Sequence, residues 1–499
     1  MAPMCSRRAF ATAASALAVL AAGRHAHAEP PGDLTELTAT QALEQILGGT
    51  IGAADYATAL AQRTEVMAGL NALITSRWEQ AIAEARSVDE RRAAGGEAGA
   101  LAGLPLVVSD NLDSAGLPTT AGTPALADWQ PEANAVVLAK ALAASGVLAA
   151  KANLHELGLG VTGDNPTFGN VANPYAPHLT AGGASSGVAA AVAARLAPFG
   201  LASDGSGSSR IPAALCGCIA FRPTLGRWAQ PGLVALSSTF DTPAAMARSI
   251  ADIALLDGIC AEAALDVELV KLSGLRLGVP ARLAAELDSE LATVLDAALA
   301  LLQSAGAVLV EVDIPDLASA DADVGPPILL HEALRELAAY LFMHDNRLSV
   351  LDIIGQVAGE AERTVLSGIA GDLAVPASAY REALVNARPR LQGLYAAGFA
   401  DNQLAAFVGP TTPLPARALG ADARVDLAGR SVPVFEAYSR HVDPPGHAGL
   451  PALSLPAGLT AQGLPVGLQL VGPAGSDGRL LAIAAAVETV LPPLPPPRL

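Results

Sequence analysis

The sequence predicts an α/β protein built on a large mixed, mostly parallel β-sheet with helices on both faces. From residue 104 onwards, short β-like runs alternate with Ala- and Leu-rich helical segments, a pattern typical of a sheet that is covered on both sides. Hydrophobic residues make up 52% of the 499 residues and charged residues 16%, so the chain can bury a large core. Aromatic residues are only 4%, and the abundant small residues favour close packing of helices and strands.

The part before residue 104 predicts a helical N-terminal layer. Thr38-Ala39-Thr40-Gln41 resembles a capping box, in which the Thr and Gln side chains satisfy each other's backbone amides at the start of a helix. Helical patterns continue through residues 56–66 and 78–94. We therefore expect a short helix and two longer ones in this layer.

The expected strands are short apolar runs bounded by turn residues. They are LPLVV (104–108), GVLAAKA (146–152), LRLGVP (275–280), AVLVEVDIP (307–315), AFVGPTT (406–412), PALSLPAG (451–458) and PVGLQLVGP (465–473). Residues 319–400 are mainly helical in pattern and are expected to form a helical cap insertion over the site. A last helix is expected near 479–490, before a proline-rich tail. With no linker or internal repeat in between, residues 29–499 are predicted to form a single domain.

The first 28 residues predict an export signal of the twin-arginine type. Arg7 and Arg8 precede an apolar run over residues 10–22, and Ala26-His27-Ala28 offers a cleavage site. The alternative is an uncleaved anchor, but the apolar run is shorter than the ~20 residues that span a bilayer. The expected location is the bacterial periplasm, with no stable membrane anchor after cleavage.

Charge and cysteine content exclude several classes of function. The chain has 30 basic and 48 acidic residues, a net charge of −18, which is the wrong sign for binding nucleic acid. After removal of Cys5 with the signal, Cys216, Cys218 and Cys260 remain, an odd number that makes a complete disulfide framework impossible. We interpret them as buried thiols, and we expect no metal site and no cofactor.

A serine- and glycine-rich stretch, SDGSGSSR (203–210), carries the first chemical signal. It follows the apolar run 196–202 and precedes Ile211-Pro212, the layout of a strand, a loop and a helix. Glycines in such a loop let backbone N–H groups converge on one point, as an oxyanion hole requires. On these residues alone, a flexible polar loop is the alternative.

The surroundings of this stretch resemble the amidase signature family of amide hydrolases. The resemblance runs through LPLVVSDNLDSAGLPTTAGT (104–123), KANLHELGLGVTGDNPTFGNVANPY (151–175), GPTTP (409–413) and AGLPALSLPAG…GLPVGLQLVGP (448–473), in that order. It implies a large mixed sheet flanked by helices and hydrolysis of amides, in some members esters, without metal or cofactor. It also implies a serine nucleophile that is activated by a second serine, held by a cis peptide, and by a lysine.

The resemblance assigns roles to the loop. It places Ser208 at the nucleophile position, and it implies that Asp204 and Arg210 brace the loop. The amides of the oxyanion hole would come from Gly205, Ser206, Gly207 and Ser208, with Ser206 in place of a usual glycine.

Two positions depart from the family pattern. The family's GGSSGG appears here as Gly182-Gly183-Ala184-Ser185-Ser186-Gly187, so Ala184 stands at the relay serine position, 24 residues before Ser208. The family's Lys-Asp-Asn appears as Ser109-Asp110-Asn111, so Ser109 stands at the triad lysine position. Flanking motifs fix both alignments.

Five side chains are candidates to replace the missing base. Lys151 lies on a strand-like run where a structural role is expected. Ser185 lies one position after the relay serine position. His155, His178 and His447 sit near family motifs, where a lone histidine is more often structural.

Two functions follow from these observations. The first is an exported amidase-family hydrolase of a small amide or ester whose activity is weak, altered or absent by the usual mechanism. The second is a catalytically inactive pseudoenzyme that acts as a binding or scaffold protein. A subunit of a tRNA-dependent amidotransferase, which shares this fold, conflicts with the export signal.

Overall fold

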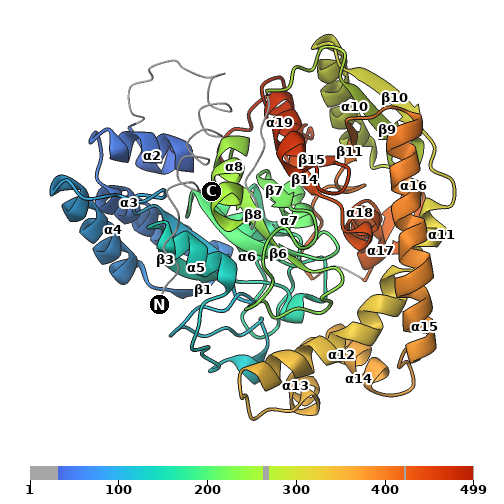
Figure 1. Cartoon of the computed structure of the whole chain (residues 1–499), viewed down its shortest axis with the longest axis horizontal. Helices are drawn as coiled ribbons and strands as arrows, with labels where there is room; N and C mark the ends of the chain where they lie inside the picture. The colour runs from blue at the N-terminus through green and yellow to red at the C-terminus, as the bar shows by residue number, and fades with distance from the viewer. Residues whose placement is uncertain (1–31, 262–268, 421–422, 498–499) are drawn as a thin grey trace.

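An eleven-stranded sheet runs through the centre of the protein, in the order β1-β3-β2-β6-β8-β7-β14-β15-β11-β9-β10 (Figure 1). The computed structural model describes residues 32–261, 269–420 and 423–497. The strands are β1 (Leu73–Ser76), β2 (Pro105–Ser109), β3 (Val147–Ala152), β6 (Phe199–Asp204), β7 (Ile219–Arg222), β8 (Thr242–Ala247), β9 (Arg276–Pro280), β10 (Val308–Val312), β11 (Ala406–Pro410), β14 (Ala452–Leu459) and β15 (Pro465–Val471). All seven runs expected to be strands lie in this sheet, and the mixed α/β fold is confirmed.

The expectation of a mostly parallel sheet is wrong. Of the ten neighbouring pairs, four are parallel and six are antiparallel. The parallel pairs lie towards the two ends of the strand order, and β6, β8, β7, β14, β15 and β11 form an antiparallel centre. Short connections explain part of this centre, because the five-residue link between β14 and β15 allows only antiparallel pairing.

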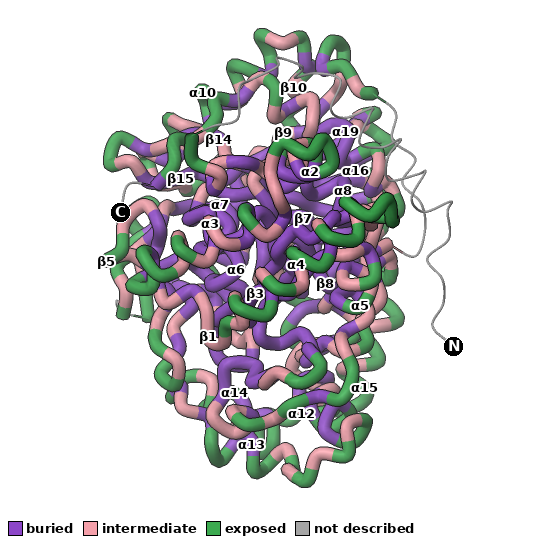
Figure 2. The backbone as a smooth tube through the Cα atoms, turned by 90° about the vertical axis from the view of Figure 1, so that its left-hand side faces the viewer, coloured by how far each residue is buried: buried purple, intermediate pink, exposed green. Residues whose placement is uncertain are grey.

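Helices cover both faces of the sheet. Leu106 and Val108 of β2 point into a core shared with α2 (Ala39–Leu47), α3 (Ala53–Val66), α5 (Val136–Ala143), α8 (Ile250–Cys260), α10 (Ser289–Ser304) and α19 (Asp477–Glu488). Val107 points the other way, into a core with α6 (Ser186–Ala193) and α7 (Arg210–Cys216). Figure 2 shows the buried residues concentrated around α6, α7 and the strands beside them.

The N-terminal helices lie where the sequence predicts, except that α3 begins at residue 53, three residues before the expected range 56–66. Thr38 caps α2 in a capping box with Gln41, as expected. The two longer helices are α3 and α4 (Trp78–Ala93), which pack against each other. The final helix, α19, also lies where it was expected.

Residues 317–401 are helical almost throughout. They form α11 (Leu317–Ala322), α12 (Gly325–Met343), α13 (Val350–Gln356), α14 (Glu360–Ala370), α15 (Ala377–Glu382) and α16 (Arg388–Asp401), with a π-helical turn over 383–387. In Figure 1 these helices lie along one side and the lower end of the molecule. Apolar residues of α12, α13 and α14 share a core with Ala121, Leu126 and Leu157, so this segment packs on the loops that follow β2 and β3.

Smaller elements complete the fold. They are α9 (Ala281–Ala284), α17 (Val434–Ser439), α18 (Asp443–Ala448), the hairpin of β4 (Ala172–Asn173) with β5 (Ala176–Thr180), the hairpin of β12 (Arg424–Leu427) with β13 (Arg430–Pro433), and short 3-10 turns at 34–36, 68–70, 124–126 and 156–158.

Several sequence predictions concern the termini and the cysteines. In the described ranges, no helix combines the length and the apolar character that a bilayer crossing needs. The predicted export signal, residues 1–28, lies outside the described residues, as does Cys5. Cys216, Cys218 and Cys260 are free and buried, and burial raises the pKa of the Cys218 thiol to about 12.

The placement of the core can be tested by comparing a buried leucine of a central strand with an exposed leucine. Leu468 on β15 is fully buried among residues from both neighbouring strands, whereas Leu301 on α10 is exposed. Leu468→Ala is expected to lower the free energy of unfolding by about 2–5 kcal/mol, because it leaves a cavity. Leu301→Ala is expected to change it by less than about 0.5 kcal/mol. Urea unfolding followed by circular dichroism measures both, and equal effects would contradict this placement of the core.

Candidate active site

The serine loop, residues 205–209, joins the end of β6 to the start of α7. The strand, the loop and the helix lie in the order that the sequence predicts. Gly207 has φ +94°, and a Cβ there would clash with the Val442 side chain, so the loop requires glycine at this position. Ser206 and Ser208 are partly exposed, while Ser209 is buried.

A buried ion pair anchors both ends of the serine loop. Arg210 Nη2 lies 2.9 Å from Asp204 Oδ1, and neither side chain is exposed to solvent. The carboxylate of Asp204 also accepts hydrogen bonds from Gly207 N at 2.8 Å and from Ser209 Oγ at 2.7 Å. Burial alone would raise the pKa of Asp204, but the positive charge and hydrogen bonds of Arg210 outweigh it, and the pKa lies well below its usual range.

Three of the four predicted oxyanion amides make no hydrogen bond among the residues that the structure describes. Gly207 N donates to Asp204, so its amide is occupied. Within residues 32–261, 269–420 and 423–497, no hydrogen bond engages the amides of Gly205, Ser206 and Ser208. These three N–H groups are the ones that can stabilise a developing oxyanion.

The loop that carries Ala184 contacts the serine loop. The peptide bond between Gly183 and Ala184 is cis, and Ser185 N donates to the carbonyl oxygen of Ser208 at 2.9 Å. The Ser185 hydroxyl donates to the carbonyl oxygen of Ser203 at 3.3 Å. The position expected for the relay serine therefore adjoins Ser208 through the backbone, but its side chain is a methyl group, and the Ser185 hydroxyl is bound elsewhere.

Ser109 is the last residue of β2 and is fully buried. Among the described residues, its hydroxyl has no hydrogen-bond partner. The nearby Asn111 connects this strand to β6, since its Nδ2 donates to Ser203 Oγ at 3.0 Å. The position expected for the triad lysine thus holds a short side chain with no charge.

Lys151 does not fill that place, because it points to the other face of the sheet. In the register of β2 with β3, Lys151 is opposite Val108 and Ala152 is opposite Ser109, and successive side chains of a strand alternate between faces. Lys151 Nζ lies 3.2 Å from Asp110 Oδ1 and donates to Leu112 O at 2.6 Å and to Thr119 Oγ1 at 3.0 Å. Burial lowers the pKa of Lys151, and the charge of Asp110 opposes that shift.

The three histidines named from the sequence have different surroundings. His155 Nε2 lies 2.8 Å from Glu362 Oε1 on α14, and His178 is exposed on β5. His447 on α18 contacts the serine loop itself: its Nε2 lies 2.9 Å from Ser206 Oγ. Its Nδ1 lies 2.7 Å from Asp321 Oδ1 on α11.

No pattern in the sequence connects these three groups. Ser206 and His447 are 241 positions apart, and Asp321 lies 126 positions before His447. Burial lowers the pKa of His447, but the hydrogen bond and the charge of Asp321 outweigh burial, so this pKa lies above its usual value.

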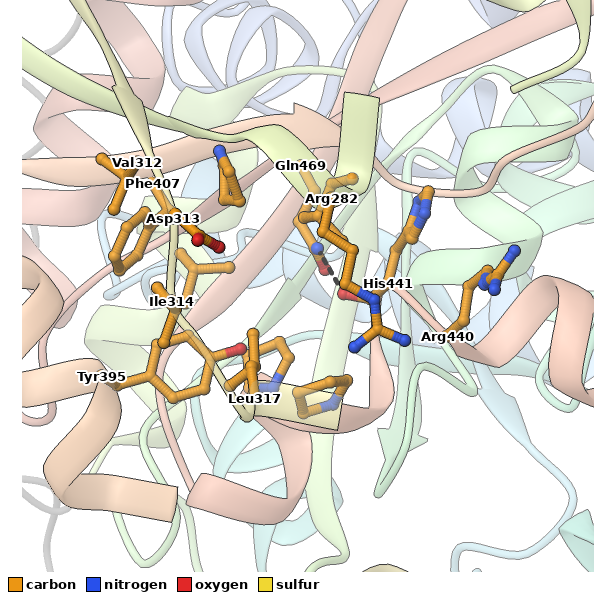
Figure 3. A pocket seen from close by; sticks show the side chains of 15 residues that line it. Arg282, Val312, Asp313, Ile314, Leu317, Tyr395, Phe407, Arg440, His441 and Gln469 are labelled. Atoms are coloured by element: carbon orange, nitrogen blue, oxygen red, sulfur yellow. Dashed lines mark hydrogen bonds between the residues drawn. The ribbon is translucent and has the colours of Figure 1, made fainter. Parts of the chain in front are cut away.

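A separate pocket lies between residues of β9, β10, β11, β15, α11, α16 and α18. Its lining is mainly apolar and includes Ile314, Leu317, Tyr395 and Phe407, with Arg282 and Arg440 at one side (Figure 3). Gln469 lines this pocket and accepts a hydrogen bond from Arg210 Nη1 at 2.7 Å. None of residues 205–209 lines it, so it is distinct from the surface that Ser206 and Ser208 present.

In the part of the chain that the structure describes, no group of three or more His, Cys, Asp or Glu side chains is arranged to hold a metal ion.

The Asp204 ion pair predicts a pH-dependent contribution to stability. Asp204→Asn leaves Arg210 buried without its charge partner and is expected to lower the free energy of unfolding by about 3–5 kcal/mol at pH 7. The folded-state pKa of Asp204 is depressed, so this contribution is fully present above the unfolded pKa of about 4 and is lost progressively as the pH falls from there through the folded-state pKa.

Urea unfolding at pH 7 and pH 3 measures the difference between the two proteins. The exposed Asp128→Asn is the matched control and is expected to have little effect at either pH. A deficit for Asp204→Asn that stays constant between the two pH values would contradict the assignment.

Comparisons with known proteins agree with the architecture. The sequence model of the family described as Amidase matches residues 56–481. The chain is 37% identical over 453 residues to an indoleacetamide hydrolase of Agrobacterium vitis, covering 90% of this chain and 96% of that protein. It is 36% identical over 482 residues to a mandelamide hydrolase of Pseudomonas putida, covering 92% of each.

Solved structures give the same result. A crystal structure of an amidase superposes with a TM-score of 0.82 at 31% identity, covering 91% of this chain and all of the other. The native peptide amidase from Stenotrophomonas maltophilia superposes with a TM-score of 0.80 at 28% identity, covering 93% of this chain and 98% of the other. Sequence, fold and relatives together place this chain in the Amidase family of hydrolases that act on amide C–N bonds.

Proposed function

We propose that this protein hydrolyses a small primary carboxamide at the serine loop, and that the Ser-Ser-Lys route contributes little to its turnover. The observation that supports the proposal is the combination of a retained loop with missing partners. Ser208 and three free amides are present, while Ser109 and Ala184 stand at the positions of the lysine and the relay serine. Lys151 is held by Asp110 on the opposite face of the sheet.

The relatives suggest the substrate class. Indoleacetamide and mandelamide are both primary carboxamides with an aromatic group on the carbon next to the carbonyl. We therefore propose an aryl-substituted acetamide as substrate and ammonia as the leaving group. The reaction needs only a hydroxyl nucleophile, a proton acceptor and oxyanion donors, and no metal or cofactor.

The size of the effects in another serine hydrolase supports weak turnover by the Ser-Ser-Lys route. In another serine hydrolase, removing the nucleophile or its base lowers turnover by ~10⁶, and the oxyanion hole and binding alone still leave ~10³–10⁴ over the reaction in water. An alkanol such as Ser208 is a poor nucleophile until a base takes its proton.

A second candidate function is a non-catalytic binding protein. The observation in its favour is Ser109, whose buried hydroxyl has no partner among the described residues and stands where the usual mechanism is expected to have its lysine base. Such a protein would bind a carboxamide at the serine loop without hydrolysing it.

We further propose that residues 1–28 direct export to the periplasm by the twin-arginine route. In cells that express the full chain, Arg7→Lys/Arg8→Lys is expected to shift the protein from the periplasmic to the cytoplasmic fraction, because the twin-arginine route recognises the arginine pair. Immunoblots of the two fractions measure the shift. An unchanged distribution would contradict this export route and leave the proposed chemistry untouched.

Restoring the two missing partners tests the proposed chemistry. In the mature protein, Ser109→Lys/Ala184→Ser is expected to raise the turnover of indoleacetamide or mandelamide by about 10²-fold or more, since a positioned acid–base contributes ~10²–10⁴. Release of ammonia measures turnover. The gain is expected to disappear when Ser208→Ala is added.

Each single reversion serves as a control, and thermal unfolding checks that every variant folds. Measurable turnover in the unmodified protein would contradict the binding-protein alternative. Absence of turnover in the unmodified protein, beside turnover in the folded double variant, would contradict the proposed hydrolase and support the binding-protein alternative.

A further inference from the structure

We propose that Ser206, His447 and Asp321 form a nucleophile, base and orienting carboxylate of the Ser-His-Asp type, which supplies the proton acceptor that the Ser-Ser-Lys route lacks. The substrate class in this proposal rests on the proposed function. The unit itself rests on geometry: Ser206 Oγ lies 2.9 Å from His447 Nε2, and His447 Nδ1 lies 2.7 Å from Asp321 Oδ1.

The two contacts of the ring fix its protonation. An aspartate next to Nδ1 holds the proton on that nitrogen, which leaves Nε2 as an acceptor for the hydroxyl of Ser206. This is the tautomer that a general base needs. Both distances lie within the 2.6–3.2 Å that nucleophile, base and orienting group show in serine hydrolases.

The imidazole is held in place from several sides. His447 is 5% exposed, and the ring of Phe240 lies against it with centroids 4.5 Å apart. Arg388 Nε donates to the backbone carbonyl of His447 at 2.9 Å. Gly446 lets α18 approach the serine loop, since a Cβ there would lie 2.5 Å from Gly205 O. The ring therefore cannot easily leave Ser206.

The serine of this unit is accessible, and free amides surround it. Ser206 is partly exposed while its base is buried. The amides of Gly205, Ser206 and Ser208 make no hydrogen bond within the described ranges, so oxyanion donors lie on the same loop as the nucleophile. By contrast, no described residue offers Ser208 Oγ a hydrogen-bonded base.

The reaction balances with these groups and water. Ser206 Oγ forms a bond to the carbonyl carbon, its proton passes to His447 Nε2, and the carbonyl electron pair moves to the oxygen. The imidazolium then donates that proton to the nitrogen, the C–N bond breaks and ammonia leaves. Water attacks the resulting ester, gives one proton to His447, and releases the carboxylic acid as Ser206 regains its proton.

Other charges face the ring and set its titration. Asp321 lies on α11, Asp443 on α18, Arg222 on β7 and Arg388 on α16. Burial raises the pKa of Asp443 to about 7. Because Asp321 makes the hydrogen bond to Nδ1, its replacement by asparagine is expected to move the titration of His447 to lower pH.

The unit is tested by locating the serine that reacts. A fluorophosphonate probe forms an adduct with an activated serine as fluoride leaves, and peptide mass spectrometry identifies the residue. In the mature protein the adduct is expected on Ser206, and it is expected there in Ser208→Ala as well. His447→Gln is expected to slow labelling by about 10²-fold or more, because the general base is lost.

Asp321→Asn tests the orienting role separately from folding. Labelling is expected to slow, and the midpoint of its pH profile is expected to shift to lower pH, which loss of a purely structural contact would not cause. His178→Ala, an exposed histidine away from the site, is the matched control and should label like the unmodified protein. Thermal unfolding verifies that each variant is folded.

The outcomes separate this inference from the proposed function. An adduct on Ser208, or labelling that is unaffected by His447→Gln, overturns the unit even if carboxamides are hydrolysed. An adduct on Ser206 that depends on His447, without hydrolysis of indoleacetamide or mandelamide, supports the unit and contradicts the proposed function. No adduct and no hydrolysis overturns both.

Discussion

Two opposite charges removed from water, Asp204 at the end of β6 and Arg210 at the start of α7, fix the geometry around the serine loop. The cost of burying them is offset by mutual attraction and by hydrogen bonds to both oxygens of the carboxylate. Arg210 also reaches Gln469 on β15 and the carbonyl oxygen of Val442 beside α18. The same pair thus ties the loop, the central strands and the helix that carries His447 to one another.

The serine loop keeps its shape without help from the two positions where the usual mechanism is expected to place its lysine and relay serine. The contacts that shape the loop come from Asp204, Arg210 and the backbone, and none involves the side chains of residues 109 or 184. The shape of the loop is therefore independent of those two side chains. The site that remains presents a hydroxyl at Ser206 next to an imidazole, in surroundings that were already rigid.

Much of the fold and part of the site follow from the sequence, because local patterns encode them. Apolar runs bounded by turn residues located seven of the eleven strands and indicated β6, a sequence motif located the Thr38 capping box, and helical periodicity located α19. The family motifs located the serine loop. The direction of strand pairing was wrong for the centre of the sheet, since apolar runs such as those of β14 and β15 do not specify parallel or antiparallel neighbours. The contacts of His447 were beyond local patterns, because Ser206 and Asp321 come from distant parts of the chain.

Asp321 belongs to α11, a helix of six residues that packs on α16 and α18 and contributes no strand to the sheet. Short helices at the edge of a fold open at lower free energy than the central strands. The orienting carboxylate is thus carried by an element that is expected to open before the central strands. On warming, the imidazole of His447 would lose its hydrogen bond to Asp321 before the sheet unfolds. Inactivation and global unfolding of this protein would then be two separate thermal events.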